Sequence, residues 1–165
     1  MGSGKSTFGK RLALHLGMPF IDLDHYLEEK EKRSINTIFE EDGEAVFRNL
    51  ETKYLIEIVK TKKACVLSLG GGTPCSESNW EILKDTKSIY LKRTLLFLSK
   101  ILIAKKHKRP LIKDLNDDEI KQLIAVKMNE RSSFYERADL IFHGYGSKKA
   151  LEKRLVDKTK QLLES

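Results

Sequence analysis

The chain has 165 residues, of which 40% are hydrophobic and 33% are charged, and its formal net charge is +7 at pH 7. This size and balance indicate one soluble globular domain that covers residues 1–165. A membrane-spanning helix needs about 18 apolar residues in a row, and neither such a run nor a signal-peptide pattern occurs, so we expect a cytoplasmic protein with no membrane partner. Cys65 and Cys75 match neither a zinc spacing nor a disulfide framework, which fits a reducing compartment.

Apolar spacing, caps and glycines predict helices and strands in alternation along the chain. Helices are expected at about 5–16, 25–33, 34–61 with a division at Gly43, 78–85, 94–104, 117–138 and 147–164. Strands are expected at about 19–24, 64–72, 88–92 and 140–145, and a charged loop at 105–117. Alternation of this kind predicts an α/β fold with a parallel sheet flanked by helices in three layers.

The excess of basic residues favours anionic partners. Lys and Arg are spread along the chain in short clusters, and neither a zinc-finger spacing nor an aromatic RNA-binding pattern occurs. We therefore expect phosphorylated or carboxylated small molecules rather than nucleic acid.

The stretch "MGSGKST" matches the end of the phosphate-binding loop pattern G-x-x-x-x-G-K-[ST] and leads into a predicted helix. Backbone N–H groups at such a helix start bind phosphate oxygens, and Lys5 would reach the β- and γ-phosphates of ATP while the Ser6 hydroxyl binds Mg²⁺. The expected nucleotide-binding residues are Gly2, Ser3, Gly4, Lys5, Ser6 and Thr7.

Two further motifs lie at the carboxyl ends of predicted strands, where open parallel sheets bind ligands. "DLD" places Asp22 and Asp24 on the same side of a strand, suited to holding a metal-bound water and to accepting a hydroxyl proton, although Asp24 could instead cap the next helix. The triplet Gly70, Gly71 and Gly72 would let the backbone approach a ligand closely, and its alternative is a mobile turn.

Three arginines are ambiguous by themselves. Arg48 could simply pair with Glu44 and Glu51 along its helix, Arg109 lies in the basic loop before a proline, and Arg131 could face solvent.

Together these motifs resemble the shikimate kinases, a family with the P-loop fold of the nucleoside monophosphate kinases. The resemblance covers nearly the whole chain and rests on "MGSGKST", "PFIDLD", "EAVFRNLE", "SLGGG", "KRPL" and "ERSSFY" in that order.

The resemblance implies transfer of the ATP γ-phosphoryl group to the 3-hydroxyl of shikimate, with Mg²⁺, by a monomer in aromatic amino-acid biosynthesis. It implies Lys5, Asp24 and Arg109 as catalytic residues, with Arg109 also contacting ATP, and Ser6 and Asp22 at the metal. The implied shikimate-binding residues are Asp24, Phe39, Phe47, Arg48, Gly70, Gly71, Gly72 and Arg131. It further implies substrate-binding helices at about 25–60 and a lid loop at about 105–117.

The family has one strand and the first loop glycine ahead of the segment that matches "MGSGKST". That strand lies in the middle of the sheet, so its neighbours would lose hydrogen-bond partners without it. We expect a sheet that lacks its first, central strand, and we expect the natural protein to start upstream of Met1.

Two other functions remain open at this point. A kinase similar to gluconate kinase would keep the phosphate loop, but it has no need for two carboxylate-binding arginines at positions 48 and 131. A catalytically inactive P-loop module would bind nucleotide without turnover.

Overall fold

The structure is a computed structural model that describes residues 2–61, 64–108 and 112–165. Its helices are α1 (Lys5–Leu16), α2 (Leu23–Glu31), α3 (Ile35–Glu41), α4 (Gly43–Thr61), α5 (Glu77–Leu83), α6 (Leu95–Ile103), α7 (Asp117–Tyr135) and α8 (Lys148–Glu164). Its strands are β1 (Phe20–Asp22), β2 (Val66–Ser68), β3 (Ile89–Lys92) and β4 (Leu140–His143), and a 3₁₀ turn spans Lys106–Lys108. No helix in these ranges is both long and apolar enough to cross a membrane.

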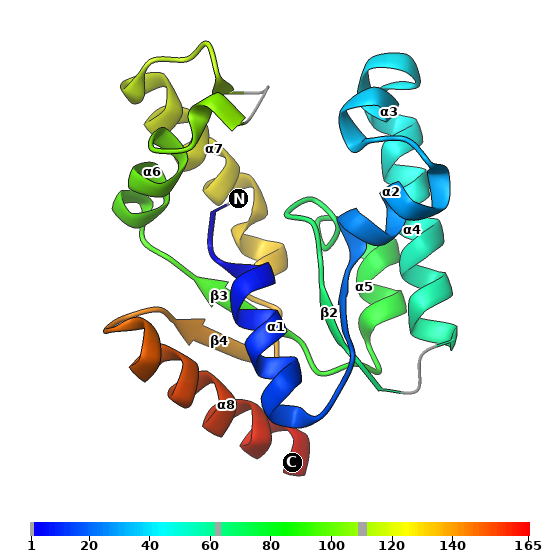
Figure 1. Cartoon of the computed structure of the whole chain (residues 1–165), viewed down its shortest axis with the longest axis vertical. Coiled ribbons are helices and arrows are strands. Elements are labelled where there is room, and N and C mark those ends of the chain that lie inside the picture. Colours follow the sequence, from blue (N-terminus) through cyan, green and yellow to red (C-terminus); the bar gives the residue numbers. More distant parts are fainter. Residues whose placement is uncertain (1, 62–63, 109–111) are drawn as a thin grey trace.

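The strands form two separate parallel pairs, which confirms the expected parallel α/β class. β1 pairs with β2 in the register Phe20 to Val66, and β3 pairs with β4 in the register Ile89 to Leu140. Within the described ranges β2 and β3 do not pair with each other, so the strands form two separate two-stranded sheets. Figure 1 shows α1 in front of the division between these two sheets.

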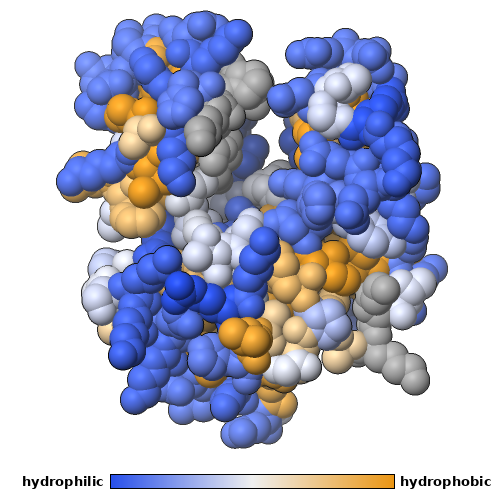
Figure 2. Space-filling model, in the orientation of Figure 1, coloured by the Kyte–Doolittle hydropathy of each residue, from blue (hydrophilic) through white to orange (hydrophobic). Residues whose placement is uncertain are grey.

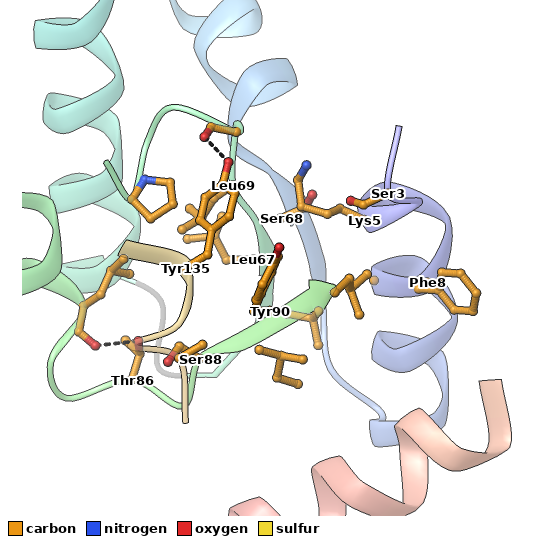
Figure 3. Close-up of a pocket in the computed structure, with 18 of the residues that line it drawn as sticks. Ser3, Lys5, Phe8, Leu67, Ser68, Leu69, Thr86, Ser88, Tyr90 and Tyr135 are labelled. Atoms are coloured by element: carbon orange, nitrogen blue, oxygen red, sulfur yellow. Dashed lines mark hydrogen bonds between the residues drawn. The ribbon is translucent and has the colours of Figure 1, made fainter. Parts of the chain in front are cut away.

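A cavity of about 780 Å³ lies at this division. Residues 65–69 of β2 and 88–91 of β3 line it, together with Phe8, Leu12 and Leu16 of α1. Figure 3 shows Leu67 and Tyr90 facing the cavity from the two strands, with Ser3 and Lys5 at one end. The cavity is therefore mostly apolar, and the phosphate loop lies at its rim.

Local sequence signals fix most helix ends. Ser34 accepts a hydrogen bond from the backbone N–H of Thr37 at 3.1 Å, and Asn116 forms a capping box with Glu119 at the start of α7. Gly43 separates α3 from α4 with a φ of 83°, a conformation that favours glycine, as the sequence predicts.

Three apolar clusters hold the elements together. One joins α2, α3, α4 and α5, and its buried members are Leu23, Leu27, Ile38, Phe47, Tyr54, Leu55, Ile58 and Leu83. A second joins α6, α7 and the segment between them through Leu98, Leu102, Ile112, Ile120 and Ile124. The third joins α1, β4 and α8 through Phe8, Phe142, Leu151 and Leu155. On the face in Figure 2, polar residues cover most of the upper right part, and apolar residues show over α6 at the upper left and at the level of β2.

Several predicted boundaries are wrong by a few residues, and one of them changes the position of a predicted site residue. The strand expected at 19–24 ends at Asp22, and α2 begins at Leu23, so Asp24 lies in the first turn of a helix and not on a strand. Leu23 and Leu27 are both completely buried, and their spacing of four residues gives the helix its apolar face. Burial of this pair overrides the alternation that "DLD" suggests.

The cavity predicts that the folded protein binds a hydrophobic dye such as ANS. Trp80 is the single tryptophan and lines the cavity, so exciting it should produce energy transfer to the bound dye that disappears in denaturant. Leu14→Ser serves as the control, because Leu14 is 80% exposed on α1 and its removal should leave the signal unchanged. Folded protein that gives no dye fluorescence would contradict the prediction.

Candidate active site

The phosphate loop and the start of α1 have the geometry of an anion site. Gly2 and Gly4 adopt φ values of 74° and 91°, which favour glycine, and Gly4 is the N-terminal cap of α1. Among the described residues no side chain hydrogen-bonds to this helix end as a cap, and the positive end of the helix dipole there favours an anion. Thr7 is exposed in the first turn.

The expected metal-binding pair is in contact. The Ser6 hydroxyl donates a 2.7 Å hydrogen bond to Oδ2 of Asp22 at the end of β1. A hydroxyl and a carboxylate are oxygen ligands of the kind that Mg²⁺ prefers, and Mg²⁺ usually completes its shell with water and substrate phosphates. The residues therefore fit Mg²⁺ accompanied by a nucleotide.

Asp24 lies beside this pair in a crowded acidic environment. Its pKa is raised from 3.8 to about 6, first by burial and then by the negative charges of Asp22 and Glu51, while the positive charge of Lys5 acts in the opposite direction. This pKa lies close to neutral pH, as is favourable for a general base.

The glycine turn that follows β2 packs directly against the acidic side chains. A Cβ atom at Gly70 would lie 2.8 Å from Oε1 of Glu51 and 2.9 Å from Oδ1 of Asp24. A Cβ atom at Gly72 would overlap the guanidinium of Arg48. A side chain at either position would force these polar groups to move, so close packing accounts for both glycines.

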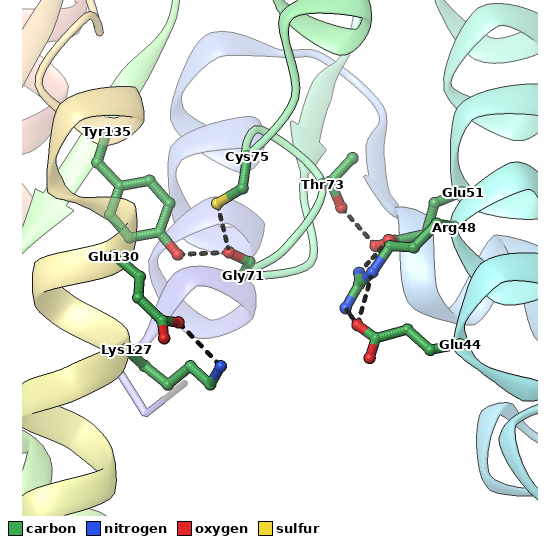
Figure 4. Close-up of polar contacts among 9 residues, drawn as sticks. All are labelled: Glu44, Arg48, Glu51, Gly71, Thr73, Cys75, Lys127, Glu130 and Tyr135. Atoms are coloured by element: carbon green, nitrogen blue, oxygen red, sulfur yellow. Dashed lines mark hydrogen bonds and ion pairs between the residues drawn. The ribbon is translucent and has the colours of Figure 1, made fainter.

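Glu51 is the site residue that sequence analysis missed as a functional candidate. It is 1% exposed and accepts a 2.6 Å hydrogen bond from the Thr73 hydroxyl through Oε1, while Oε2 pairs with Arg48 (Figure 4). Its only signal in the sequence is its place three residues after Arg48 on a helix, which also suits a surface ion pair. Only the burial of Glu51 distinguishes a site residue from a surface ion pair. This burial depends on the glycine turn, which is distant in sequence.

Arg48 pairs with both Glu44 and Glu51, as the simpler interpretation of its helix predicts. Its side chain is nevertheless 37% exposed, and its guanidinium lies 5.0 Å from the centre of the Phe47 ring. Phe47 in turn packs against Phe39, with 4.6 Å between ring centres. The arginine is therefore held on several sides and still reaches the surface.

Arg131 approaches the same turn from α7. Both Arg131 and Arg48 act to lower the pKa of the Cys75 thiol, although burial raises it overall, so both guanidinium groups lie near Cys75. Tyr135, one turn after Arg131 on α7, donates a 2.5 Å hydrogen bond to the Gly71 carbonyl. Figure 4 shows the turn between α7 and α4, which carry the two arginines.

The structure thus brings most of the predicted residues together, and one further predicted residue is not among those it describes. The phosphate loop, the two aspartates, the glycine turn, Arg48 and Arg131 lie around the carboxyl ends of β1 and β2 and the start of α1. Arg109 lies outside the described residues. Of the expected lid, Ile112 is 1% exposed in the cluster with α6 and α7, and Lys106 donates a 3.3 Å hydrogen bond to the Leu115 carbonyl.

Comparisons with known proteins agree with this arrangement. The family model described as "Shikimate kinase" matches residues 1–164. The chain is 37% identical over 163 residues to a shikimate kinase of Flavobacterium johnsoniae, covering 98% of this chain and 91% of the relative. It is 41% identical over 143 residues to that of Azobacteroides pseudotrichonymphae, covering 86% and 84%.

Solved structures show the same similarity. The crystal structure of shikimate kinase from Bacteroides thetaiotaomicron matches with a TM-score of 0.89 and 34% identity, over 100% of this chain and 94% of that one. Shikimate kinase from Acinetobacter baumannii, in complex with shikimate, matches with a TM-score of 0.84 and 33% identity, over 99% and 88%. The motifs, the geometry of the site and these matches together show that the chain belongs to the shikimate kinase family.

Proposed function

We propose that this protein transfers the γ-phosphoryl group of ATP to the 3-hydroxyl of shikimate. The observation that carries the proposal is the convergence of the phosphate loop, a carboxylate with a pKa near 6 and two arginines on one glycine turn. The Acinetobacter baumannii relative was solved in complex with shikimate, which supports the same substrate here. We also propose that the chain is one kinase domain with substrate-binding helices at about 25–60 and a lid at about 105–117, and that it acts as a cytoplasmic monomer.

In this proposal the loop residues 2–7 bind the phosphates of ATP through backbone N–H groups and through the ammonium of Lys5. Ser6 would hold Mg²⁺ directly and Asp22 would hold it through water, and the ion would neutralise phosphate charge when bound. Phosphoryl transfer depends mainly on positioning and on charge stabilisation, and the site provides both.

Asp24 accepts the proton of the substrate hydroxyl, because it is the carboxylate with the raised pKa and lies near Lys5. Arg48 and Arg131 bind the substrate carboxylate, since a planar guanidinium can bind a planar anion through two hydrogen bonds. Arg109 stabilises the charge on the transferring phosphoryl group from the lid.

The direct test is ADP release from Mg·ATP with shikimate, with gluconate and with neither. We expect turnover that depends on shikimate, because shikimate is the ligand in the structure of the Acinetobacter baumannii relative. Turnover with gluconate alone would favour the other kinase. Binding of ATP without turnover on either compound would favour an inactive nucleotide-binding module.

Asp24→Asn should lower kcat by about 100-fold or more, because the amide cannot accept a proton. Dissociation constants for ATP and shikimate, measured by calorimetry, should change little.

In the unaltered protein, kcat/KM should fall as the pH drops below about 6, where Asp24 becomes protonated. Asp157→Asn on the exposed part of α8 is the matched control and should retain full activity.

Asp24→Asn should also stabilise the folded protein at neutral pH. The folded-state pKa of about 6 exceeds the ordinary 3.8, so the Asp24 carboxyl contributes stability below about pH 4 and this contribution is lost as the pH rises through 6. Denaturant unfolding should therefore show Asp24→Asn more stable at pH 7, by up to about 3 kcal/mol, with the gain vanishing near pH 4. If the difference in unfolding free energy between Asp24→Asn and the unaltered protein is the same at pH 7 and pH 4, burial does not raise the pKa of Asp24 as proposed.

A further inference from the structure

Arg93 is a buried cation outside the residues that the family motifs identify. It lies between β3 and α6, is 7% exposed and forms no ion pair with a carboxylate in the described ranges. An uncompensated charge in such a place is costly unless its N–H groups find acceptors. Its acceptors are therefore informative about its role.

Those acceptors join two segments that are distant in sequence. Nε of Arg93 donates to the Ser3 carbonyl at 3.2 Å, and Nη1 donates to the Gly144 carbonyl at 2.8 Å. The guanidinium also lies 5.3 Å from the Phe8 ring centre and 4.9 Å from that of Phe97. One side chain thus connects the phosphate loop, α1, α6 and the end of β4.

The contact with Ser3 fixes the orientation of the loop backbone. A peptide unit is planar and trans, so its carbonyl and the following N–H point in opposite directions. Because the Ser3 carbonyl points to Arg93, the Gly4 N–H points away from it. Gly4 is the cap of α1, and Phe8 packs against it, with 3.1 Å from a Cβ atom placed there to the Phe8 ring.

Gly144 provides the space that the guanidinium occupies. A Cβ atom at position 144 would overlap Arg93, although the φ of Gly144 does not require glycine. The backbone N–H of Gly144 also donates to the Lys92 carbonyl at 3.3 Å, which holds this segment beside the end of β3. Glycine at position 144 is therefore explained by the space that Arg93 needs, and not by a backbone conformation.

We propose that Arg93 is a positioning residue for nucleotide binding, which holds the Ser3–Gly4 peptide with its N–H free for a phosphate oxygen. Its positive charge also raises the potential at the loop. The inference rests on the proposed use of ATP by this site. It does not involve shikimate binding, because the hydrogen bonds and ring contacts of Arg93 in the described part of the chain are with Ser3, Gly144, Phe8 and Phe97.

The test compares dissociation constants of Mg·ATP and of shikimate, by calorimetry, for the unaltered chain and three variants. Arg93→Met should weaken Mg·ATP binding by about tenfold or more and change shikimate binding by less than twofold. Arg93→Lys, which keeps the charge and loses the fork of N–H groups, should recover only part of the loss. Arg137→Met is the matched control, because Arg137 also stacks on two rings, those of Trp80 and Phe134, and pairs with Glu77 away from the loop.

A second comparison keeps the test valid if Arg93→Met folds poorly. Gly144→Ala should weaken Mg·ATP binding through the displaced guanidinium, and it should have no further effect in an Arg93→Ala background. Equal Mg·ATP affinity in Arg93→Met and in the unaltered chain would overturn the inference and leave the proposed function intact, as would additive effects in the Gly144 cycle. Failure of the unaltered chain to bind Mg·ATP would overturn both.

Discussion

The buried carboxylate of Glu51 is the interaction on which the rest of the site depends. Removing a charge from water is costly, and a carboxylate at 1% exposure is tolerated only when donors surround it. Here α4 supplies Arg48 one turn earlier, and the glycine turn supplies the Thr73 hydroxyl. Once these donors are fixed, the turn must approach α4 so closely that Gly70 has no room for a side chain. The Glu51 carboxylate is therefore in contact with both the glycine turn and the guanidinium of Arg48.

The same arrangement sets the electrostatic balance of the site. Glu51 and Asp22 bring negative charge near Asp24, and with burial they raise its pKa to about 6, which the nearby Lys5 opposes. Such a cluster destabilises the folded protein at neutral pH and provides a base at that pH. The apolar clusters around α4 and between α6 and α7 must offset this cost, since the divided sheet adds a cavity and no hydrogen bonds between β2 and β3 in the described part of the chain.

The sequence allowed prediction of the features that depend on local signals. The helix that follows "MGSGKST", the break at Gly43 and the turn at the glycine triplet all depend on residues within a few positions of one another, and each appears where it was expected. The position of Asp24 was predicted wrongly, because burial of Leu23 and Leu27 starts a helix where alternation suggests a strand. Glu51 and Arg93 escaped prediction because each is defined by burial against segments 22 to 90 residues away. No local pattern carries that information.

The dependence on Glu51 can be tested by the shikimate dissociation constant of Glu51→Gln, because Glu51 holds Arg48 at the proposed shikimate site. Glu57→Gln is the matched control, since Glu57 lies on the same helix and accepts 2.7 Å hydrogen bonds from Tyr26 and Lys30 away from the glycine turn. We expect Glu51→Gln to weaken shikimate binding by about tenfold or more while Mg·ATP still binds, and Glu57→Gln to change neither affinity. Unchanged shikimate affinity in a folded Glu51→Gln protein would show that Glu51 does not position Arg48 for the substrate.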